Sequence, residues 1–111
     1  MDKVVIGLVE KVKIKGVKEV EVLVKIDTGS RTNSIDTNLA SEAQLGPIIK
    51  SVSIKSSHGK QIRPVVKAKI EIGGKILIAS FNIASRGHLD YPVLIGTRTL
   101  KRGFLIDPSK K

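Results

Sequence analysis

One aspartate in this chain is placed where acid–base chemistry can occur. Asp27 ends a strand-like segment and enters a turn of sequence Asp-Thr-Gly-Ser, residues 27–30. Two carboxyl groups that share one proton can activate a water with one member and protonate a leaving group with the other. The tripeptide alone is weak evidence, because turns of this composition are also common in loops that carry no chemistry.

A second feature lies near the end of the chain. An apolar run, Val93 to Ile95, closes on Gly96 and is followed by residues 97–102, which predict one helical turn. By itself the run predicts only a buried strand and the entry to a helix. Together with the Asp-Thr-Gly turn, however, it resembles the retropepsin-like aspartic proteases, in which such a turn sits against an apolar pair followed by glycine.

Short strands are the elements that would position these residues. Between residues 18 and 26 apolar side chains alternate with charged ones, and Gly73-Gly74 predicts a hairpin joining 65–72 to 75–83. Residues 39–45 predict a short helix, capped by one of residues 36–38. The polar stretch before that helix predicts a loop. Together these patterns predict an all-β barrel or sandwich with one or two short helices.

The resemblance narrows when further motifs are included. The matching stretches are residues 25–36, 56–60, 63–66, 84–86, 91–96 and 104–108. In this order they are similar to a bacterial and archaeal family that carries the name ATP-dependent zinc protease. Its members are now regarded as retropepsin-like endopeptidases linked to ATP-grasp glutamate ligases. The resemblance implies one retropepsin-like aspartic protease domain over residues 1–111, folded as a small closed barrel with hydrolase activity. The absence of cysteines fits a cytoplasmic location.

The resemblance also implies roles for particular residues. Asp27 would be catalytic, Thr28 would hydrogen-bond across a dimer, Gly29 would let substrate backbone approach, and Ser30 would orient the carboxylate or bind substrate. The expected flap tip is Ser56, Ser57, His58, Gly59 and Lys60, and the expected support behind the turn is Leu94, Ile95 and Gly96. One departure is that Thr97, then Arg98, follows Gly96, where the family usually has arginine directly after the glycine.

The number of Asp-Thr-Gly turns in the chain predicts a homodimer. The chain has one Asp-Thr-Gly turn, whereas the proposed chemistry needs two carboxylates. We therefore expect a two-fold homodimer with Asp27 of each copy at the axis. The expected activity is that of an aspartic endopeptidase on a peptide or protein substrate. The family's link with glutamate ligases implies acidic or glutamylated peptides.

Composition leaves two alternatives open. The 111 residues carry 20 Lys and Arg against 10 Asp and Glu, a net charge of +10 that favours acidic partners. A small basic barrel that binds RNA or a ribosome is the main rival, although three aromatic residues are few for base stacking. The other alternative is a catalytically inactive, peptide-binding module of the same shape. The lysines at 11, 13, 15 and 18 predict either a solvated strand face or a basic binding surface.

Metal, cofactor and membrane chemistry are not expected. There is no cysteine, and the two histidines, His58 and His88, lie far apart in the sequence without a His-Glu-x-x-His pattern. No phosphate-binding Gly-x-x-x-x-Gly-Lys loop is present. No apolar run approaches the roughly 20 residues of a membrane-spanning helix. We therefore predict no zinc site, no cofactor and no membrane segment, with nucleic acid a less favoured partner.

Overall fold

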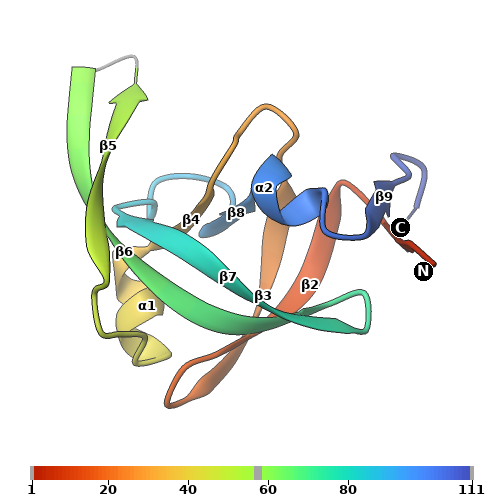
Figure 1. The fold of residues 1–111 in the computed structure, drawn as a ribbon, viewed down its shortest axis with the longest axis horizontal. Coiled ribbons are helices and arrows are strands. Elements are labelled where there is room, and N and C mark those ends of the chain that lie inside the picture. The colour runs from red at the N-terminus through yellow and green to blue at the C-terminus, as the bar shows by residue number, and fades with distance from the viewer. Residues whose placement is uncertain (1, 57–58, 111) are drawn as a thin grey trace.

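The computed structural model describes residues 2–56 and 59–110. Strands dominate this part of the chain, with two short helices between them (Figure 1). In chain order the elements are β1 (Val4–Ile6), β2 (Val9–Lys15), β3 (Glu19–Ile26), β4 (Asn33–Asp36), α1 (Thr37–Glu42), β5 (Lys50–Ser56), β6 (Gly59–Ile72), β7 (Lys75–Ala84), β8 (Val93–Ile95), α2 (Thr97–Leu100) and β9 (Phe104–Ile106).

Six of the strands close into a barrel. The main sheet runs in the order β2-β3-β8-β4-β7-β6-β5, and β2 also pairs with β6, so that the ring closes and β5 remains outside it. Closure removes the open edges that a flat sheet of this size would expose. The prediction of a small closed all-β barrel with two short helices is therefore confirmed.

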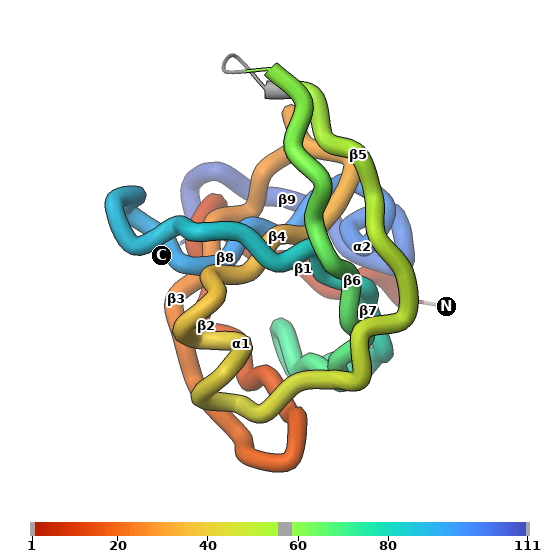
Figure 2. The backbone as a smooth tube through the Cα atoms, turned by 90° about the vertical axis from the view of Figure 1, so that its left-hand side faces the viewer, coloured from red at the N-terminus to blue at the C-terminus, as the bar shows by residue number. Residues whose placement is uncertain are grey.

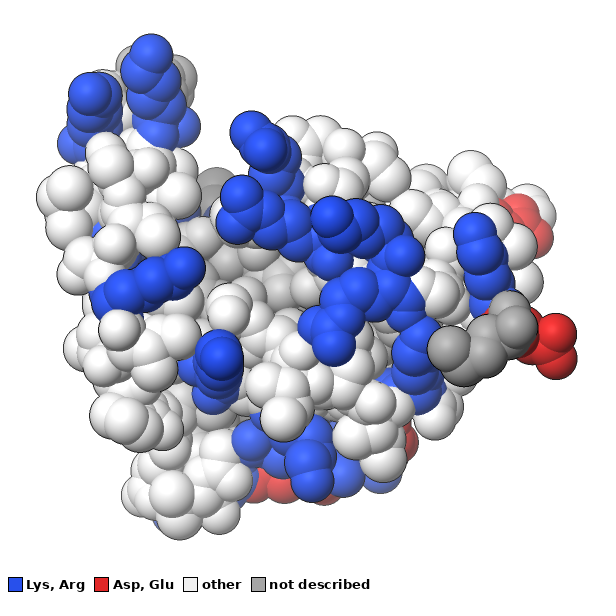
Figure 3. Space-filling view, in the orientation of Figure 1, with Lys and Arg blue, Asp and Glu red and all other residues white. Residues whose placement is uncertain are grey.

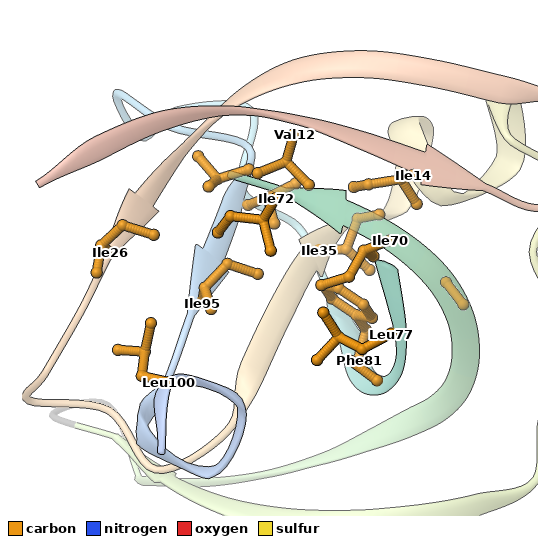
Figure 4. Packing of buried hydrophobic residues seen from close by; sticks show 14 of the residues in the cluster. Val12, Ile14, Ile26, Ile35, Ile70, Ile72, Leu77, Phe81, Ile95 and Leu100 are labelled. Atoms are coloured by element: carbon orange, nitrogen blue, oxygen red, sulfur yellow. The ribbon is translucent and has the colours of Figure 1, made fainter. Parts of the chain in front are cut away.

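The core explains the apolar alternation along the strands. In β3, Val24 and Ile26 are buried, whereas Leu23 is 52% exposed and points away from the interior. β-Branched residues fill the barrel because they pack well on pleated strands. Figure 4 shows Ile26 and Ile95 from neighbouring strands, with Leu100 from α2 beside them, in the same apolar cluster.

The expected loop before the first helix is wrong over residues 33–36. These residues form β4, which pairs with β7 on one side and β8 on the other, and all four are buried. Polar residues tolerate this burial where their hydrogen bonds are made inside the protein. The helix begins at Thr37, two residues earlier than expected, because Asp36 caps it by accepting a hydrogen bond from the backbone nitrogen of Asn38.

Two hairpins extend from β6. The predicted Gly73-Gly74 turn joins β6 to β7, and both glycines have positive φ values, 59° and 83°, which favour glycine in a two-residue turn. The other end of β6 pairs with β5 and leaves the barrel as a projecting arm (Figures 1 and 2). This arm contains Ser56, Gly59 and Lys60 of the expected flap tip.

The first and last strands form a separate small sheet. β1 pairs with β9 in parallel, from Val4 opposite Phe104 to Ile6 opposite Ile106. Figure 1 shows both ends of the chain on the side of the molecule away from the β5–β6 arm. No helix in the described part of the chain is long and apolar enough to cross a membrane.

Candidate active site

Three neighbouring strands place Asp27. β8 lies between β3, to which it is parallel, and β4, to which it is antiparallel. The backbone nitrogen of Asp27 donates to the carbonyl oxygen of Ile95 at 2.9 Å, which extends the β3–β8 ladder by one bond. The two sequence features expected to act together, the Asp-Thr-Gly turn and the apolar run before Gly96, are thus in direct contact.

Asp27 is partly buried, and its carboxylate is fixed by its own turn. Its Oδ1 accepts a hydrogen bond from the backbone nitrogen of Gly29 at 2.9 Å. A Cβ atom on Gly29 would lie 3.2 Å from the same oxygen, so the glycine leaves room for this close contact. Thr28 and Gly29 are exposed, and within residues 2–56 and 59–110 no hydrogen bond reaches Oδ2. One carboxylate oxygen is therefore oriented by the turn, and the other accepts no hydrogen bond from the described residues.

Gly96 packs directly behind this turn. A Cβ atom there would lie 2.5 Å from the carbonyl oxygen of Thr32 and 2.8 Å from that of Ser30, too close for any side chain. The hydroxyl of Ser30 donates to the Thr32 carbonyl at 2.8 Å, and the backbone nitrogen of Thr97 donates to the Ser30 carbonyl at 2.8 Å. The start of α2 thus holds the loop that follows Asp27.

A buried asparagine, missed by the sequence reasoning, ties these segments together. Oδ1 of Asn33 accepts from the backbone nitrogen of Gly96 at 2.8 Å. Its Nδ2 donates to Oγ1 of Thr99 at 2.7 Å and to the carbonyl of Ser80 at 3.0 Å. With 4% of its surface exposed, Asn33 links β4, β7, the Gly96 turn and α2. An asparagine in a polar stretch gave no signal of this role in the sequence.

A second buried asparagine extends the network to the projecting arm. Nδ2 of Asn82 donates to the carbonyl of Asn33 at 2.9 Å and to Oγ1 of Thr32 at 3.2 Å. Its Oδ1 accepts from Nη1 of Arg63 at 3.0 Å, and Arg63 lies on the part of β6 that pairs with β5. A continuous set of hydrogen bonds therefore connects the base of the arm with the loop after Asp27.

The arm holds the expected flap residues only in part. Ser56 pairs with Gly59, and Lys55 with Lys60, so β5 and β6 run antiparallel up to the predicted tip. Ser57 and His58 lie outside the described residues. The role of this tip as a flap stays a prediction.

Two pockets border the segment 27–33. The first, which we call the Asp27 pocket, has a volume of about 470 Å³. It is lined by Leu8, Val9, Lys25, Ile26, Asp27, Arg86, Leu89, Asp90, Tyr91 and Leu94. Its two cationic and two anionic residues balance, and its remaining wall is largely apolar. A peptide bond held here would lie beside the Asp27 carboxylate.

The second, which we call the basic pocket, has a volume of about 550 Å³. It is lined by Thr32, Asn33, Lys50, Val52, Val65, Lys67, Ile78, Ala79, Ser80, Asn82, Arg98, Thr99 and Arg102. Four of these residues are cationic and none is anionic. Figure 3 shows Lys and Arg side chains gathered around the hollow of this face.

Arg86 is the charged group that connects the Asp27 pocket with the strand behind it. Its Nε and Nη2 both donate to the carbonyl of Tyr91 at 3.3 Å, and its backbone nitrogen donates to Oδ1 of Asp36 at 2.7 Å. Burial lowers the pKa of Arg86, and Arg63 lowers it further, whereas Asp27 and Asp36 oppose this shift. Arg86 therefore lies within electrostatic range of Asp27.

Asp36 anchors the loop that carries Arg86. The hydrogen bond from the Arg86 backbone nitrogen is the largest cause that lowers the pKa of Asp36, and bonds from the start of α1 add to it, while burial acts in the opposite direction. The backbone nitrogen of Asp36 also donates to the carbonyl of Pro92 at 2.8 Å. One side of the Asp27 pocket is thus attached to β4.

The lysines of the first hairpin pair with acidic residues. Lys11 lies 3.7 Å from Glu21, Lys13 lies 3.9 Å from Glu71, and Lys15 contacts Glu19 at 3.7 Å. This arrangement favours a solvated strand face over a basic binding surface. Within residues 2–56 and 59–110, no group of three His, Asp or Glu residues is arranged to hold a metal ion. His88 lies exposed in the loop before β8.

Comparison with known families yields one model match. The model described as "RimB-like: Retropepsin-like aspartic endopeptidase RimB" matches residues 35–111, about two thirds of the chain. The match begins after the turn of residues 27–30, so it does not depend on the Asp-Thr-Gly sequence. No curated protein matches the chain significantly.

Solved structures show a similar fold. The Legionella pneumophila protein Lpg0085, of unknown function, is 20% identical, with a TM-score of 0.69 over 97% of this chain and 95% of its own. The simian foamy virus protease is 17% identical, with a TM-score of 0.63 over 84% and 91%. The EIAV protease, solved with the inhibitor HBY-793, is 17% identical, with a TM-score of 0.69 over 84% of each chain. The fold is therefore retropepsin-like.

Proposed function

Because the chain belongs to the RimB-like family of retropepsin-like aspartic endopeptidases, we propose that it hydrolyses peptide bonds with a water activated between two copies of Asp27. The observation that carries this proposal is the Asp27 turn itself. Its carboxylate is oriented through Oδ1 by the Gly29 backbone nitrogen and lies at the end of β3, beside a pocket. Thr28, exposed on the same turn, is the proposed contact to the partner's turn.

The second carboxylate comes from a second copy of the chain. The β1–β9 sheet has only two strands among the described residues, and sheets this small are marginally stable by themselves. Val5 and Leu105, one on each strand, are 45% and 51% exposed. A two-fold partner packed against this face would cover both side chains, and in the proposed dimer it also supplies the second Asp27 turn.

The proposed reaction uses the two carboxyl groups in opposite protonation states. Like charges a few ångströms apart do not both ionise easily, so the pair holds one proton. The ionised Asp27 takes a proton from water as the water oxygen bonds to the peptide carbonyl carbon, and the protonated Asp27 donates its proton to the carbonyl oxygen. When the tetrahedral intermediate collapses, the Asp27 that took the water proton gives it to the amine nitrogen, the other Asp27 takes a proton from a hydroxyl of the intermediate, and the C–N bond breaks.

Acidic or glutamylated peptides are the proposed substrates. The net charge of +10 favours the approach of acidic chains. Four cationic residues that line the basic pocket also support this choice. RNA binding, the main alternative, receives less support because the lysines of the first hairpin are paired with glutamates.

A peptide-library cleavage assay from acid to neutral pH tests the proposal. Asp27→Asn removes the ionisable group while keeping its shape, and we expect the rate to fall by at least about a thousandfold. Glu42→Gln, which removes one carboxylate from an exposed position of α1 outside both pockets, should retain most of the activity. Equal cleavage by wild type and Asp27→Asn would refute the assignment of Asp27.

Two other outcomes would favour the alternatives. Binding of peptides without cleavage by the wild type would indicate an inactive peptide-binding module. Tight binding of RNA with a steep salt dependence would indicate the nucleic-acid alternative. Sedimentation tests the dimer, because a protein that stays monomeric at high concentration cannot supply the second carboxylate.

A further inference from the structure

We infer that the basic pocket is a separate recognition site, which binds an acidic side chain of the substrate at a position that does not flank the cleaved bond. The inference rests on the proposed peptidase function and adds where the charge of the substrate is recognised. The residues that would carry it are Lys50, Lys67, Arg98 and Arg102, none of which belongs to the Asp-Thr-Gly turn or to the projecting tip.

The charges of this pocket are not neutralised by the protein. None of the thirteen residues that line it is acidic. No ion pair joins any of its four cations to a carboxylate within residues 2–56 and 59–110, whereas Lys11, Lys13 and Lys15 each contact a glutamate. Four uncompensated cations around one hollow produce a positive potential that favours an anionic ligand.

The shape of the pocket is held by the buried asparagine network. Asn33, Asn82 and Thr99 line it, and each is at most 4% exposed. Their hydrogen bonds join β4, β7 and α2, so the floor is formed before any ligand arrives. Nη1 of Arg102 donates to the carbonyl of Ile78 at 2.6 Å, which fixes one of the four cations at the wall.

The walls fit a short aliphatic chain that ends in a carboxylate. Val52, Val65, Ile78 and Ala79 line the pocket together with the cations. Apolar walls bury methylene groups, and an arginine can bind a carboxylate through two parallel hydrogen bonds. A glutamate side chain has both parts. A nucleic acid is less well matched, because no aromatic residue lines the pocket for base stacking.

The residues that line the two pockets indicate where along the substrate the recognised acidic residue lies. A cleaved peptide bond must lie against Asp27, so the side chains on either side of that bond fall at the Asp27 pocket. Asp27 does not line the basic pocket, which begins at Thr32 on the far end of the loop. An acidic side chain in the basic pocket therefore belongs to a residue further along the substrate.

A binding experiment on the full-length Asp27→Asn protein tests this inference without turnover. The probe is acetyl-Glu-Ala-Glu-Ala-Glu-amide, compared with the same peptide carrying glutamine in place of glutamate. We expect the glutamate peptide to bind at least about tenfold more tightly. In amide NMR spectra it should shift the signals of Thr32, Asn33, Ser80 and Thr99.

Charge-matched variants locate the site. The double variant Lys50→Gln/Arg98→Gln should weaken binding of the glutamate peptide by about tenfold. The control Lys18→Gln/Lys101→Gln removes the same net charge from exposed positions outside the pocket and should change binding by less than about twofold. Thermal unfolding of each variant checks that the fold is intact.

Three results would overturn the inference. Equal losses in both double variants would show that only net charge matters. Shifts confined to residues of the Asp27 pocket would place the acid beside the cleaved bond. A short single-stranded RNA that displaces the peptide and shifts the same amides more strongly would assign the pocket to nucleic acid. Failure of the proposed peptidase function can be distinguished from failure of this inference. In that case the wild type would cleave no peptide, while the glutamate peptide would still bind as described above.

Discussion

The Asp27 pocket and the basic pocket lie at opposite ends of one short loop and differ in charge and in rigidity. The first contains a carboxylate and has balanced charges, and one side of it is an exposed loop attached through Asp36. The second has four cations, no acid, and a floor of buried, hydrogen-bonded side chains. The difference separates two tasks, the chemistry at a carboxylate and the selection of a charged substrate. Asn33 and Gly96 connect the two, since both hold the loop between them.

Gly96→Ala should have the largest effect, because it disturbs both pockets at once. A methyl group there would meet backbone oxygens of Ser30 and Thr32 at 2.8 and 2.5 Å. We expect the free energy of unfolding to fall by about 2–4 kcal/mol, and peptide binding and cleavage to fall together. Urea denaturation and the two assays above measure this. Gly87→Ala, where nothing lies within 4 Å, is the control; equal behaviour of the two variants would contradict the packing argument.

Asn33→Ala should have the second largest effect. It should disturb the basic pocket more than the turn that carries Asp27. The variant leaves the Gly96 nitrogen, the Thr99 hydroxyl and the Ser80 carbonyl without their partner. Such losses in a buried site cost about 2–3 kcal/mol. Chemical denaturation should show this loss, and the glutamate peptide should bind more weakly. Asn38→Ala changes an exposed asparagine and should be nearly neutral; a similar loss there would argue against the network.

Asp36→Asn tests the anchor of the Asp27 pocket through pH. Hydrogen bonds, the largest from Arg86, hold the pKa of Asp36 below its ordinary value, so its charge stabilises the fold. That stabilisation is present above the unfolded pKa of about 3.9 and is lost as the pH falls through the lower, folded value. We expect Asp36→Asn to cost about 1 kcal/mol at pH 7.

The measurement compares the unfolding free energy of Asp36→Asn with that of wild type at several pH values. The difference in unfolding free energy should narrow below about pH 4, because wild-type Asp36 is then protonated in the unfolded chain and increasingly in the folded one. Ser41→Ala, at an exposed position of α1, removes no ionisable group and is the control. A constant difference from pH 7 to pH 3 would contradict the charge argument.

Lys11→Gln should have the smallest effect and sharpens the contrast between paired and unpaired cations. Lys11 pairs with Glu21 at 3.7 Å, and both side chains are about half exposed or more. Exposed ion pairs of this kind contribute below about 0.5 kcal/mol. Neither stability nor binding of the glutamate peptide should change measurably. A loss of binding as large as that of the Lys50 and Arg98 variant would remove the distinction between the two groups of cations.

The sequence was sufficient to predict the parts of the site that depend on backbone. Asp27 follows an alternating strand, and Gly96 follows an apolar run, so both could be assigned to strand ends before the structure was known. The number and spacing of such strands predicted a barrel or a sandwich, and the family resemblance decided in favour of the closed barrel. These patterns are local, because the side-chain alternation of a strand is set within a few residues.

The parts that depend on long-range contacts could not be predicted. β4 looked like a loop because its residues are mostly polar. Its burial depends on hydrogen bonds with distant segments, among them Asn82, Thr99, Gly96 and Arg86. The basic pocket combines Lys50 of β5 and Lys67 of the barrel part of β6 with cations at and after α2. The 20 Lys and Arg residues are spread over the chain. The sequence does not show which of them form ion pairs with acidic residues and which are available to bind a ligand.

The length of β6 has a consequence for how this fold can vary among relatives. Residues 59–64 pair with β5 alone, whereas residues 69–71 belong to both the β6–β7 hairpin and the closure with β2. Insertions or deletions at the outer end therefore leave the barrel register untouched. Because side chains alternate along a strand, a change of two residues on each side of the arm preserves which face they present, and a change of one inverts it. Arms whose strands are longer or shorter by an even number of residues are thus the length variants that this architecture accepts most easily.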